Sequence, residues 1–214
     1  MLKILLHFIL PAGVLLGLTG CQLPLENVPP SGSVLFQDDF STPAGHWRTT
    51  LGDVGLAGMY KGVFRIVVKA PGVQIWSTPG LELTAVRLEV DAARFGGPEE
   101  NRMGLVCRYR SASDYYFFII SSDGYYGVGK VTQGVPLLLG QEQMQYSAAI
   151  HTGWAINHLR ADCVGDTLTF YVNYLPVALV HDGDHAGGDV GLLAGAFEQT
   201  GVDVIFDNFI AFQP

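Results

Sequence analysis

The chain is poor in charged residues and in cysteine, and both shortages narrow what it can be. Only 15% of its 214 residues are charged and 49% are hydrophobic, so the sequence is too apolar for a disordered chain. Lys and Arg number 12 against 20 Asp and Glu, a net charge of -8 that argues against nucleic-acid binding. Three cysteines are too few for a small disulfide-rich scaffold.

Helical periodicity is also missing. After Cys21, no window of a dozen residues carries an apolar stripe at the period of a helix. Glycine is abundant instead, with 27 residues beside 12 Phe and 9 Tyr, which is typical of many short strands joined by tight turns. A chain of 214 residues is expected to form one folded domain.

Alternating apolar and polar residues predict strands from residue 34 onward. Residues 84–91 alternate most cleanly, and residues 115–120 are apolar on both faces, as expected of a central strand. Strands that recur about every 8–12 residues predict an all-β sandwich or barrel. The further strands are expected at residues 63–69, 102–110, 125–131, 157–163, 167–172, 191–197 and 202–212.

The N-terminus is typical of a bacterial export signal. Lys3 precedes a nearly uncharged run, and Leu18-Thr19-Gly20-Cys21 resembles the lipobox of bacterial lipoproteins, in which the cysteine thiol is acylated. The alternative is an uncleaved helix with an incidental cysteine. Two or three acyl chains hold a protein at a membrane far more firmly than one.

These features predict a domain organisation and a location. We expect a signal peptide at residues 1–20, a Pro-containing tether at 21–33 and a β-sandwich domain at 34–214. The acylated (palmitate-carrying) Cys21 would tie the protein to membrane lipid, facing outside the cytoplasm.

Short motifs along the mature chain follow the order of one superfamily. They are Phe36-Gln37-Asp38-Asp39-Phe40, Gly104-Leu105-Val106-Cys107-Arg108-Tyr109, Asp114-Tyr115-Tyr116-Phe117-Phe118, Leu159-Arg160-Ala161-Asp162-Cys163 and Phe206-Asp207-Asn208-Phe209. On these motifs, the chain resembles the concanavalin A-like lectin/glucanase superfamily, in its laminin-G-like or sugar-hydrolase-associated modules. The resemblance covers about residues 34–212 and implies a two-sheet jelly roll (a concanavalin A-like β-sandwich) whose curved sheet often binds carbohydrate.

The resemblance extends only in part to the catalytic strand of the glucanases, Glu-x-Asp-x-(x)-Glu. Glu89 and Asp91 match the first two positions, but Arg94 stands at the third, which removes the general acid/base. The sequence therefore predicts no catalysis of this type, and the two carboxylates are interpreted as part of a solvated strand face. No Gly-x-Ser-x-Gly or phosphate-loop motif occurs.

Cys107 and Cys163 lie in two predicted strands, each on the more apolar face. Because an exported domain meets an oxidising compartment, we expect a disulfide between them; two buried free thiols are the alternative. No cofactor is required, although Asp38, Asp39 and Asp207 could meet where the first and last strands pair. Their carboxylates would suit a structural calcium ion there, or they are turn and strand-end residues.

A set of polar and aromatic residues forms the predicted ligand-binding face. Alternation in residues 102–110 places Met103, Leu105, Cys107 and Tyr109 on one face and Arg102, Arg108 and Arg110 on the other. Basic and hydroxyl groups could bind sugar hydroxyls while aromatic rings stack on sugar C–H surfaces; ordinary packing is the alternative. The candidates are Arg108, Tyr126, Lys130, Tyr171 and Trp76.

The sequence thus predicts a lipid-anchored, extracytoplasmic β-sandwich that binds a glycan or cell-wall polymer without catalysis. A structural or protein-interaction module of the cell envelope is the alternative. A carbohydrate-active enzyme that uses carboxylates outside the known pattern is less favoured.

Overall fold

Antiparallel strands build the whole fold in the computed structural model, which describes residues 29–42 and 45–214. Residues 1–20 and the acylation candidate Cys21 lie outside this part of the chain. The described residues form no helix, and thus contain no apolar helix of membrane-spanning length.

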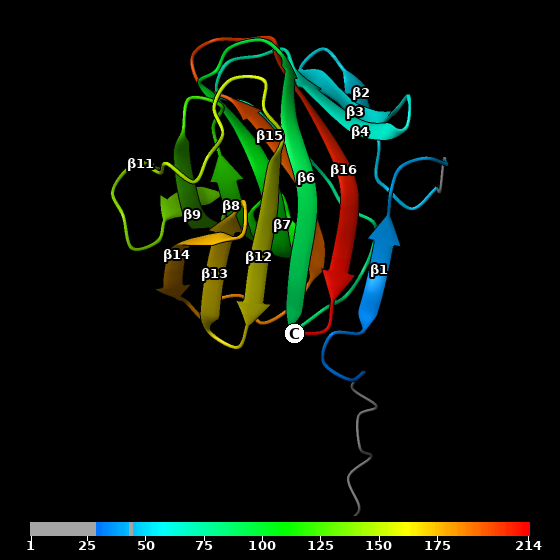
Figure 1. The fold of residues 1–214 in the computed structure, drawn as a ribbon, viewed down its shortest axis with the longest axis vertical. Helices are drawn as coiled ribbons and strands as arrows, with labels where there is room; N and C mark the ends of the chain where they lie inside the picture. The colour runs from blue at the N-terminus through cyan, green and yellow to red at the C-terminus, as the bar shows by residue number, and fades with distance from the viewer. Residues whose placement is uncertain (1–28, 43–44) are drawn as a thin grey trace, which may run out of the picture.

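Nine of the strands form sheet A, which faces the viewer in Figure 1. Its order is β14-β13-β12-β6-β16-β4-β3-β2, and β1 pairs with β16 as well. The bounds are β1 (Val34–Asp38), β2 (Thr50–Gly52), β3 (Gly55–Tyr60), β4 (Val63–Val68), β6 (Val86–Gly96), β12 (Asn157–Val164), β13 (Thr167–Val172), β14 (Leu175–His181) and β16 (Val202–Phe212).

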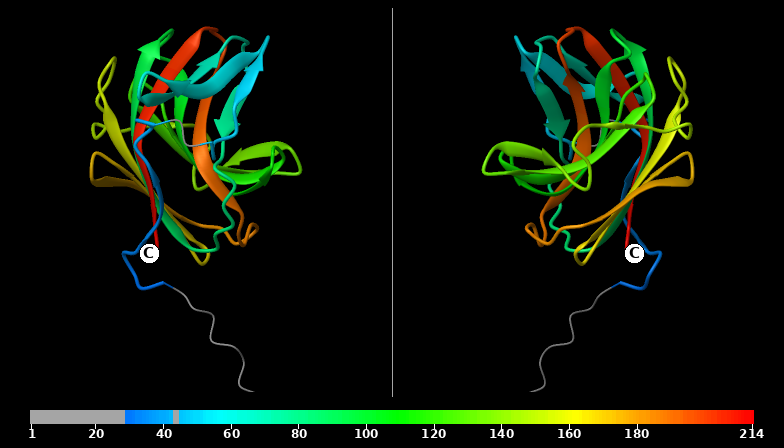
Figure 2. Two further views of the ribbon diagram at one scale, coloured as in Figure 1. Left: turned by 90° about the vertical axis from the view of Figure 1, so that its right-hand side faces the viewer. Right: turned by 90° about the vertical axis from the view of Figure 1, so that its left-hand side faces the viewer.

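Seven strands form sheet B, which lies behind sheet A in Figure 1. Its order is β10-β9-β8-β7-β15-β5, and β11 pairs with β9. The side views in Figure 2 show the two sheets stacked as separate layers. The bounds are β5 (Gln74–Ser77), β7 (Asn101–Ser111), β8 (Asp114–Ile120), β9 (Tyr125–Thr132), β10 (Val135–Leu138), β11 (Gln145–Tyr146) and β15 (Asp189–Ala196).

The main core lies between the sheets and follows from the alternation in the sequence. Val86, Leu88 and Val90 of β6 are buried in this core, whereas the charged residues between them point outward. The predicted disulfide is confirmed: Cys107 of β7 and Cys163 of β12 are bonded across the core, and neither is exposed. The prediction of an all-β, two-sheet jelly roll is also confirmed.

The outer faces of the two sheets differ in character. Sheet A carries ion pairs such as Arg65–Asp203 on its outer side. Sheet B instead carries a second apolar cluster on the side away from the main core, formed by Val106, Tyr109, Tyr115, Phe117, Ile119, Val131 and Leu193. We call this side the outer face of sheet B. An apolar outer face is unusual in a two-layer fold. The residues of this cluster are at most 9% exposed, because they pack against one another and against Trp76, Leu138 and Met144.

The predicted assignment of residues 102–110 to two faces is wrong at the C-terminal end of this segment. Leu105 and Cys107 lie in the main core as expected, but Tyr109 belongs to the outer cluster. The cause is a β-bulge at Arg108, whose φ of 52° is left-handed and where the pairing of β7 with β8 shifts register. An inserted residue moves every later side chain to the opposite face. Arg108 is therefore not on a polar face, and it is only 2% exposed.

Candidate functional site

A pocket of about 190 Å³ opens on the outer face of sheet B. Phe117 and Ile119 of β8 and Arg102 of β7 lie on its sheet side, while Leu137 and Leu138 of β10 form a wall. The side views show the hairpin of β9 and β10 standing out from the sandwich, which explains how β10 can flank the sheet (Figure 2). The complete lining is Gln74, Arg102, Phe117, Ile119, Pro136, Leu137, Leu138, Met144 and Phe197.

Glycines leave room on this face. Gly195 of β15 pairs with Arg102 on one side and with Gln74 on the other, so the two polar side chains flank a residue without a side chain. A Cβ atom at Gly195 would lie 3.0 Å from Cγ of Gln74 and 3.3 Å from Cδ of Arg102. The neighbouring row across the sheet is Gly127, Ile119, Gly104, Leu193 and Trp76.

Aromatic rings continue the face beyond the pocket. The Trp76 indole Nε1 donates a hydrogen bond to the Tyr109 hydroxyl oxygen at 2.6 Å, and the Trp76 ring centroid lies 5.8 Å from that of Tyr115. The ring centroid of Tyr115 in turn lies 6.4 Å from that of Phe117, which lines the pocket. Burial raises the pKa of the Tyr115 hydroxyl to about 12, so this group is a neutral donor and acceptor at physiological pH.

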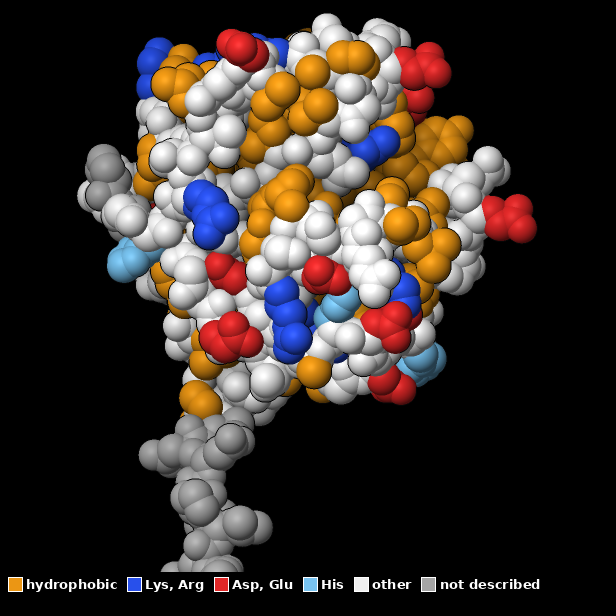
Figure 3. Space-filling model, turned by 180° about the vertical axis from the view of Figure 1, so that it is seen from behind, with side chains coloured by type: hydrophobic (Ala, Val, Ile, Leu, Met, Phe, Trp, Pro, Cys, Tyr) orange, Lys and Arg blue, Asp and Glu red, His pale blue; other side chains and the backbone are white. Residues whose placement is uncertain are grey.

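Two further depressions lie in sequence beyond the pocket. One of about 370 Å³ includes Gln74, Trp76 and Tyr109, and shares Gln74 with the pocket. The next, of about 460 Å³, shares Arg48 and Tyr109 with the first depression. Figure 3 shows the molecule from this side, with hydrophobic side chains gathered in patches over its upper half and basic side chains between them. The face is therefore long enough for more than a single small ligand.

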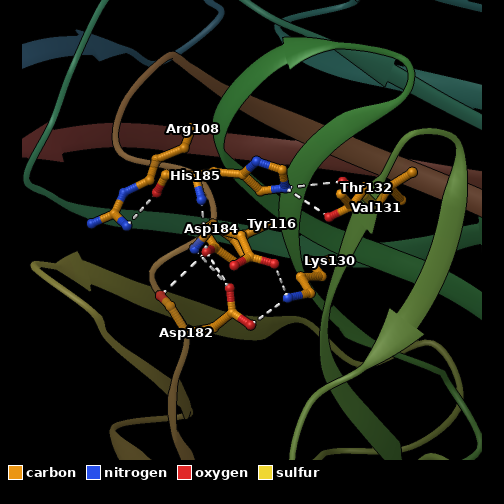
Figure 4. A network of polar contacts seen from close by, with 8 residues as sticks. All are labelled: Arg108, Tyr116, Lys130, Val131, Thr132, Asp182, Asp184 and His185. Atoms are coloured by element: carbon orange, nitrogen blue, oxygen red, sulfur yellow. Dashed lines mark hydrogen bonds and ion pairs between the residues drawn. The ribbon is translucent and has the colours of Figure 1, made fainter.

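The five predicted ligand-binding residues do not come together. Trp76 lies on the outer face of sheet B, at the aromatic cluster. Tyr126 packs against the main core, and Tyr171 lies on sheet A with the Arg160 guanidinium 4.4 Å from its ring centroid. Arg108 and Lys130 belong to a separate polar network at the end of the sandwich, shown in Figure 4.

That network ties the segment after β14 to sheet B. Lys130 donates hydrogen bonds to the carboxylates of Asp182 and Asp184, each at 2.5 Å, and the Tyr116 hydroxyl donates to Asp182 at 2.6 Å (Figure 4). Arg108 donates to the carbonyl oxygens of His185 and Gly165, both at 2.7 Å. These contacts hold a loop in place, which gives Arg108 and Lys130 structural roles.

We expect Lys130→Met to lower the free energy of unfolding by about 2 kcal/mol at pH 7, between the costs of losing surface and buried ion pairs. Burial favours the neutral form of Asp182, but hydrogen bonds from Lys130 and Tyr116 outweigh it and lower the pKa of this carboxyl. A lowered pKa adds stability above pH ~4 that is lost as the pH falls through the folded-state pKa. The variant should therefore lose less stability than the wild type between pH 5 and pH 2, about the window of this titration, in urea denaturation.

The exposed Lys69 provides the matched control, since Lys69→Met removes the same charge without a partner among the described residues. Between about pH 5 and pH 2, the free energy of unfolding of Lys69→Met should fall by as much as that of the wild type. If Lys130→Met also loses as much stability as the wild type over this pH range, the role given to the Lys130–Asp182 pair is contradicted.

The two glucanase-like carboxylates lie away from the pocket, on the outer side of sheet A. Nδ1 of His158 lies 2.9 Å from Asp91, and its Nε2 lies 3.6 Å from Glu89. Arg94 does not share their surroundings, because it is 7% exposed, pairs with Glu99 at 2.9 Å and lies under the Trp154 ring.

The calcium hypothesis for Asp38, Asp39 and Asp207 stays a prediction. Both Asp38 oxygens accept hydrogen bonds, from the Phe40 amide at 2.8 Å and the Trp47 indole at 3.0 Å. Burial raises the pKa of Asp207, and the charges of Asp91 and Asp39 add to the rise. Among the described residues, no three or more His, Cys, Asp and Glu side chains are grouped as metal ligands.

Comparison with known proteins identifies the fold. No protein-family profile and no curated protein match the sequence. Carbohydrate binding module CBM66 from Bacillus subtilis matches with a TM-score of 0.62 and 15% identity, over 78% of this chain and 95% of that chain. Bacillus licheniformis beta-glucanase matches with a TM-score of 0.58 and 10% identity, over 84% and 97%. The fold is the two-sheet jelly roll that these solved structures share.

A protein of unknown function with a galectin-like fold from Bacillus subtilis matches this jelly roll too, with a TM-score of 0.61 and 9% identity, over 86% and 97% of the two chains. A binding module and a hydrolase thus both share this jelly-roll architecture. At such identities the likeness concerns the fold alone.

Sequence reasoning missed most of the pocket, and one signal could have found it. Tyr115, Phe117 and Ile119 alternate with core residues, so β8 is apolar on both faces. In a two-layer jelly roll a strand of this kind turns one apolar face away from the main core, and such a face is a binding candidate. Arg102 and Gln74 carry no comparable signal.

Proposed function

We propose that this protein is a glycan-binding module whose binding face is the outer face of sheet B. The observation that carries the proposal is the pocket beside the aromatic cluster on this face. Rings such as Trp76 offer flat apolar surfaces to sugar C–H groups, while Gln74 and Arg102 offer hydrogen-bond donors to hydroxyls. The similar folds of a carbohydrate binding module and a beta-glucanase support a sugar-related role.

The module acts without catalysis and is held outside the cytoplasm by an acylated Cys21. Support for the first point is that Arg94 replaces the third carboxylate of the glucanase pattern, and that Glu89 and Asp91 lie on the other sheet. Support for the second is the lipobox-like sequence at residues 18–21.

Glycan-array binding of the protein carrying Cys21→Ala, which prevents acylation, tests this function. We expect Trp76→Ala to weaken binding at least about tenfold, as loss of a central aromatic contact does. Trp154→Ala is the matched control, because Trp154 is 64% exposed and does not line the pocket or the two depressions. It should bind like the wild type.

A variant that keeps every aromatic ring separates binding from folding. Gly195→Val should fill the space between Gln74 and Arg102 and weaken binding while the melting temperature is followed in parallel. The proposal is wrong if no glycan is retained by the wild type, or if Trp76→Ala binds as well as Trp154→Ala.

Protein interaction is the second candidate function. Val135 and Leu137 on the hairpin strand β10 are 66% and 56% exposed, which suits a protein contact at this sheet edge. A stoichiometric partner that co-purifies with the protein, together with an absence of sugar binding, would favour this role.

A further inference from the structure

The pocket contains a basic group without an acidic counterpart. The guanidinium carbon of Arg102 lies 4.0 Å from the centroid of the Phe197 ring, so the group is stacked at the pocket wall. Within the described chain, Arg102 forms no ion pair and its side chain forms no hydrogen bond. Burial lowers the pKa of Arg102, yet the group stays charged at any physiological pH.

Several other arginines of the molecule have carboxylate partners. Arg65, Arg87, Arg94 and Arg160 each pair with a carboxylate, and three of these arginines lie on the outer side of sheet A. A chain with a net charge of -8 has many carboxylates to offer, so the unpaired state of Arg102 is a local property of the pocket. A partly buried charge without a partner costs free energy that an incoming anion would recover.

Two more arginines lie farther along the same face. Arg48 and Arg110 line the depression farthest from the pocket, and Arg110 donates to the carbonyl oxygen of Gly187 rather than to a carboxylate. Two carboxylates line that depression as well: Asp189 accepts hydrogen bonds from the Gly80 and Leu81 amides, and Glu82 is exposed. The depression is therefore of mixed charge, unlike the pocket at Arg102.

We infer that the glycan bound on this face is acidic and that Arg102 binds a carboxylate of one of its sugars. This inference rests on the proposed glycan-binding function and adds the class of ligand. The planar fork of Arg102 matches the two oxygens of a carboxylate, and Phe197 holds its plane. Gln74, across Gly195, offers an amide to the same sugar, and the Phe117 ring offers an apolar surface.

Binding to paired polysaccharides tests the inference. The probes are polygalacturonate, alginate and hyaluronan, each beside its carboxyl-reduced counterpart, measured by calorimetry or affinity electrophoresis with the Cys21→Ala protein. The wild type should bind at least one acidic polymer, and its carboxyl-reduced counterpart at least tenfold more weakly. Arg102→Gln should weaken binding of the acidic polymer at least tenfold, and Arg102→Lys by less.

Arg87→Gln is the matched control, because it changes the net charge equally and lies on sheet A. It should leave binding unchanged, and equal losses in the two variants would overturn a specific site. Equal binding of acidic and carboxyl-reduced polymers, abolished by Trp76→Ala but not by Arg102→Gln, would overturn the inference and leave the proposed function standing. Binding of no glycan, acidic or neutral, would defeat the proposed function itself.

Discussion

Replacing Cys107 and Cys163 together by alanine is expected to lower the free energy of unfolding by about 4 kcal/mol. The disulfide joins residues 56 positions apart, and in the chain-entropy model a loop of this size restricts the unfolded chain strongly. It also links β7 of sheet B to β12 of sheet A through the main core, where both cysteines are fully buried. Urea denaturation followed by tryptophan fluorescence measures the change.

The single variants Cys107→Ala and Cys163→Ala serve as controls for the double replacement. Each single variant loses the same cross-link. If the bond rather than the side-chain volume is responsible, the free energy of unfolding should therefore decrease by similar amounts in all three variants. If the double variant loses less than about 1 kcal/mol of unfolding free energy relative to the oxidised wild type, the stabilising role of the cross-link is contradicted, because the expected loss is about 4 kcal/mol.

Most of the fold could be predicted because two-residue alternation is a local property of the chain. The segments 84–91 and 202–212 alternate, and they became the neighbouring strands β6 and β16 of sheet A. The disulfide could be predicted because both cysteines fall on apolar faces of predicted strands, where a bond is favoured in an oxidising compartment.

The roles of Arg108 and Lys130 could not be predicted, because they depend on non-local contacts. The bulge at Arg108 arises where the pairing of β7 with β8 and β15 shifts register. A prediction from strict two-residue alternation assumes that no such shift occurs. Lys130 is engaged by Asp182, which lies 52 residues farther along the chain. Trp76 was proposed only as an aromatic from a loop or strand end, whereas it lies within β5 on the outer face of sheet B. Its neighbours Tyr109 and Tyr115 could not be predicted, because the sheet register brings them to Trp76.

Glycine at position 104 is required by the close approach of two strands, and Gly104→Ala is expected to lower the free energy of unfolding by about 3 kcal/mol or more. A Cβ atom there would lie 1.9 Å from the carbonyl oxygen of Phe118 and 2.9 Å from Cα of Ile119. Both atoms belong to the backbone of β8, which is hydrogen-bonded to β7 and cannot turn aside as a side chain would. Urea denaturation and the yield of soluble protein measure the effect.

Gly58→Ala in β3 is the matched control for this substitution. Its Cβ would meet only Cγ2 of Thr49, at 3.8 Å, which is an ordinary contact. Its stability should stay within about 0.5 kcal/mol of the wild type, since alanine also restricts the unfolded chain. Equal stability of the two variants would show that β7 can move away from β8. Because Arg102 lies on β7 two residues from Gly104, such freedom would also remove the rigid support on which the pocket depends.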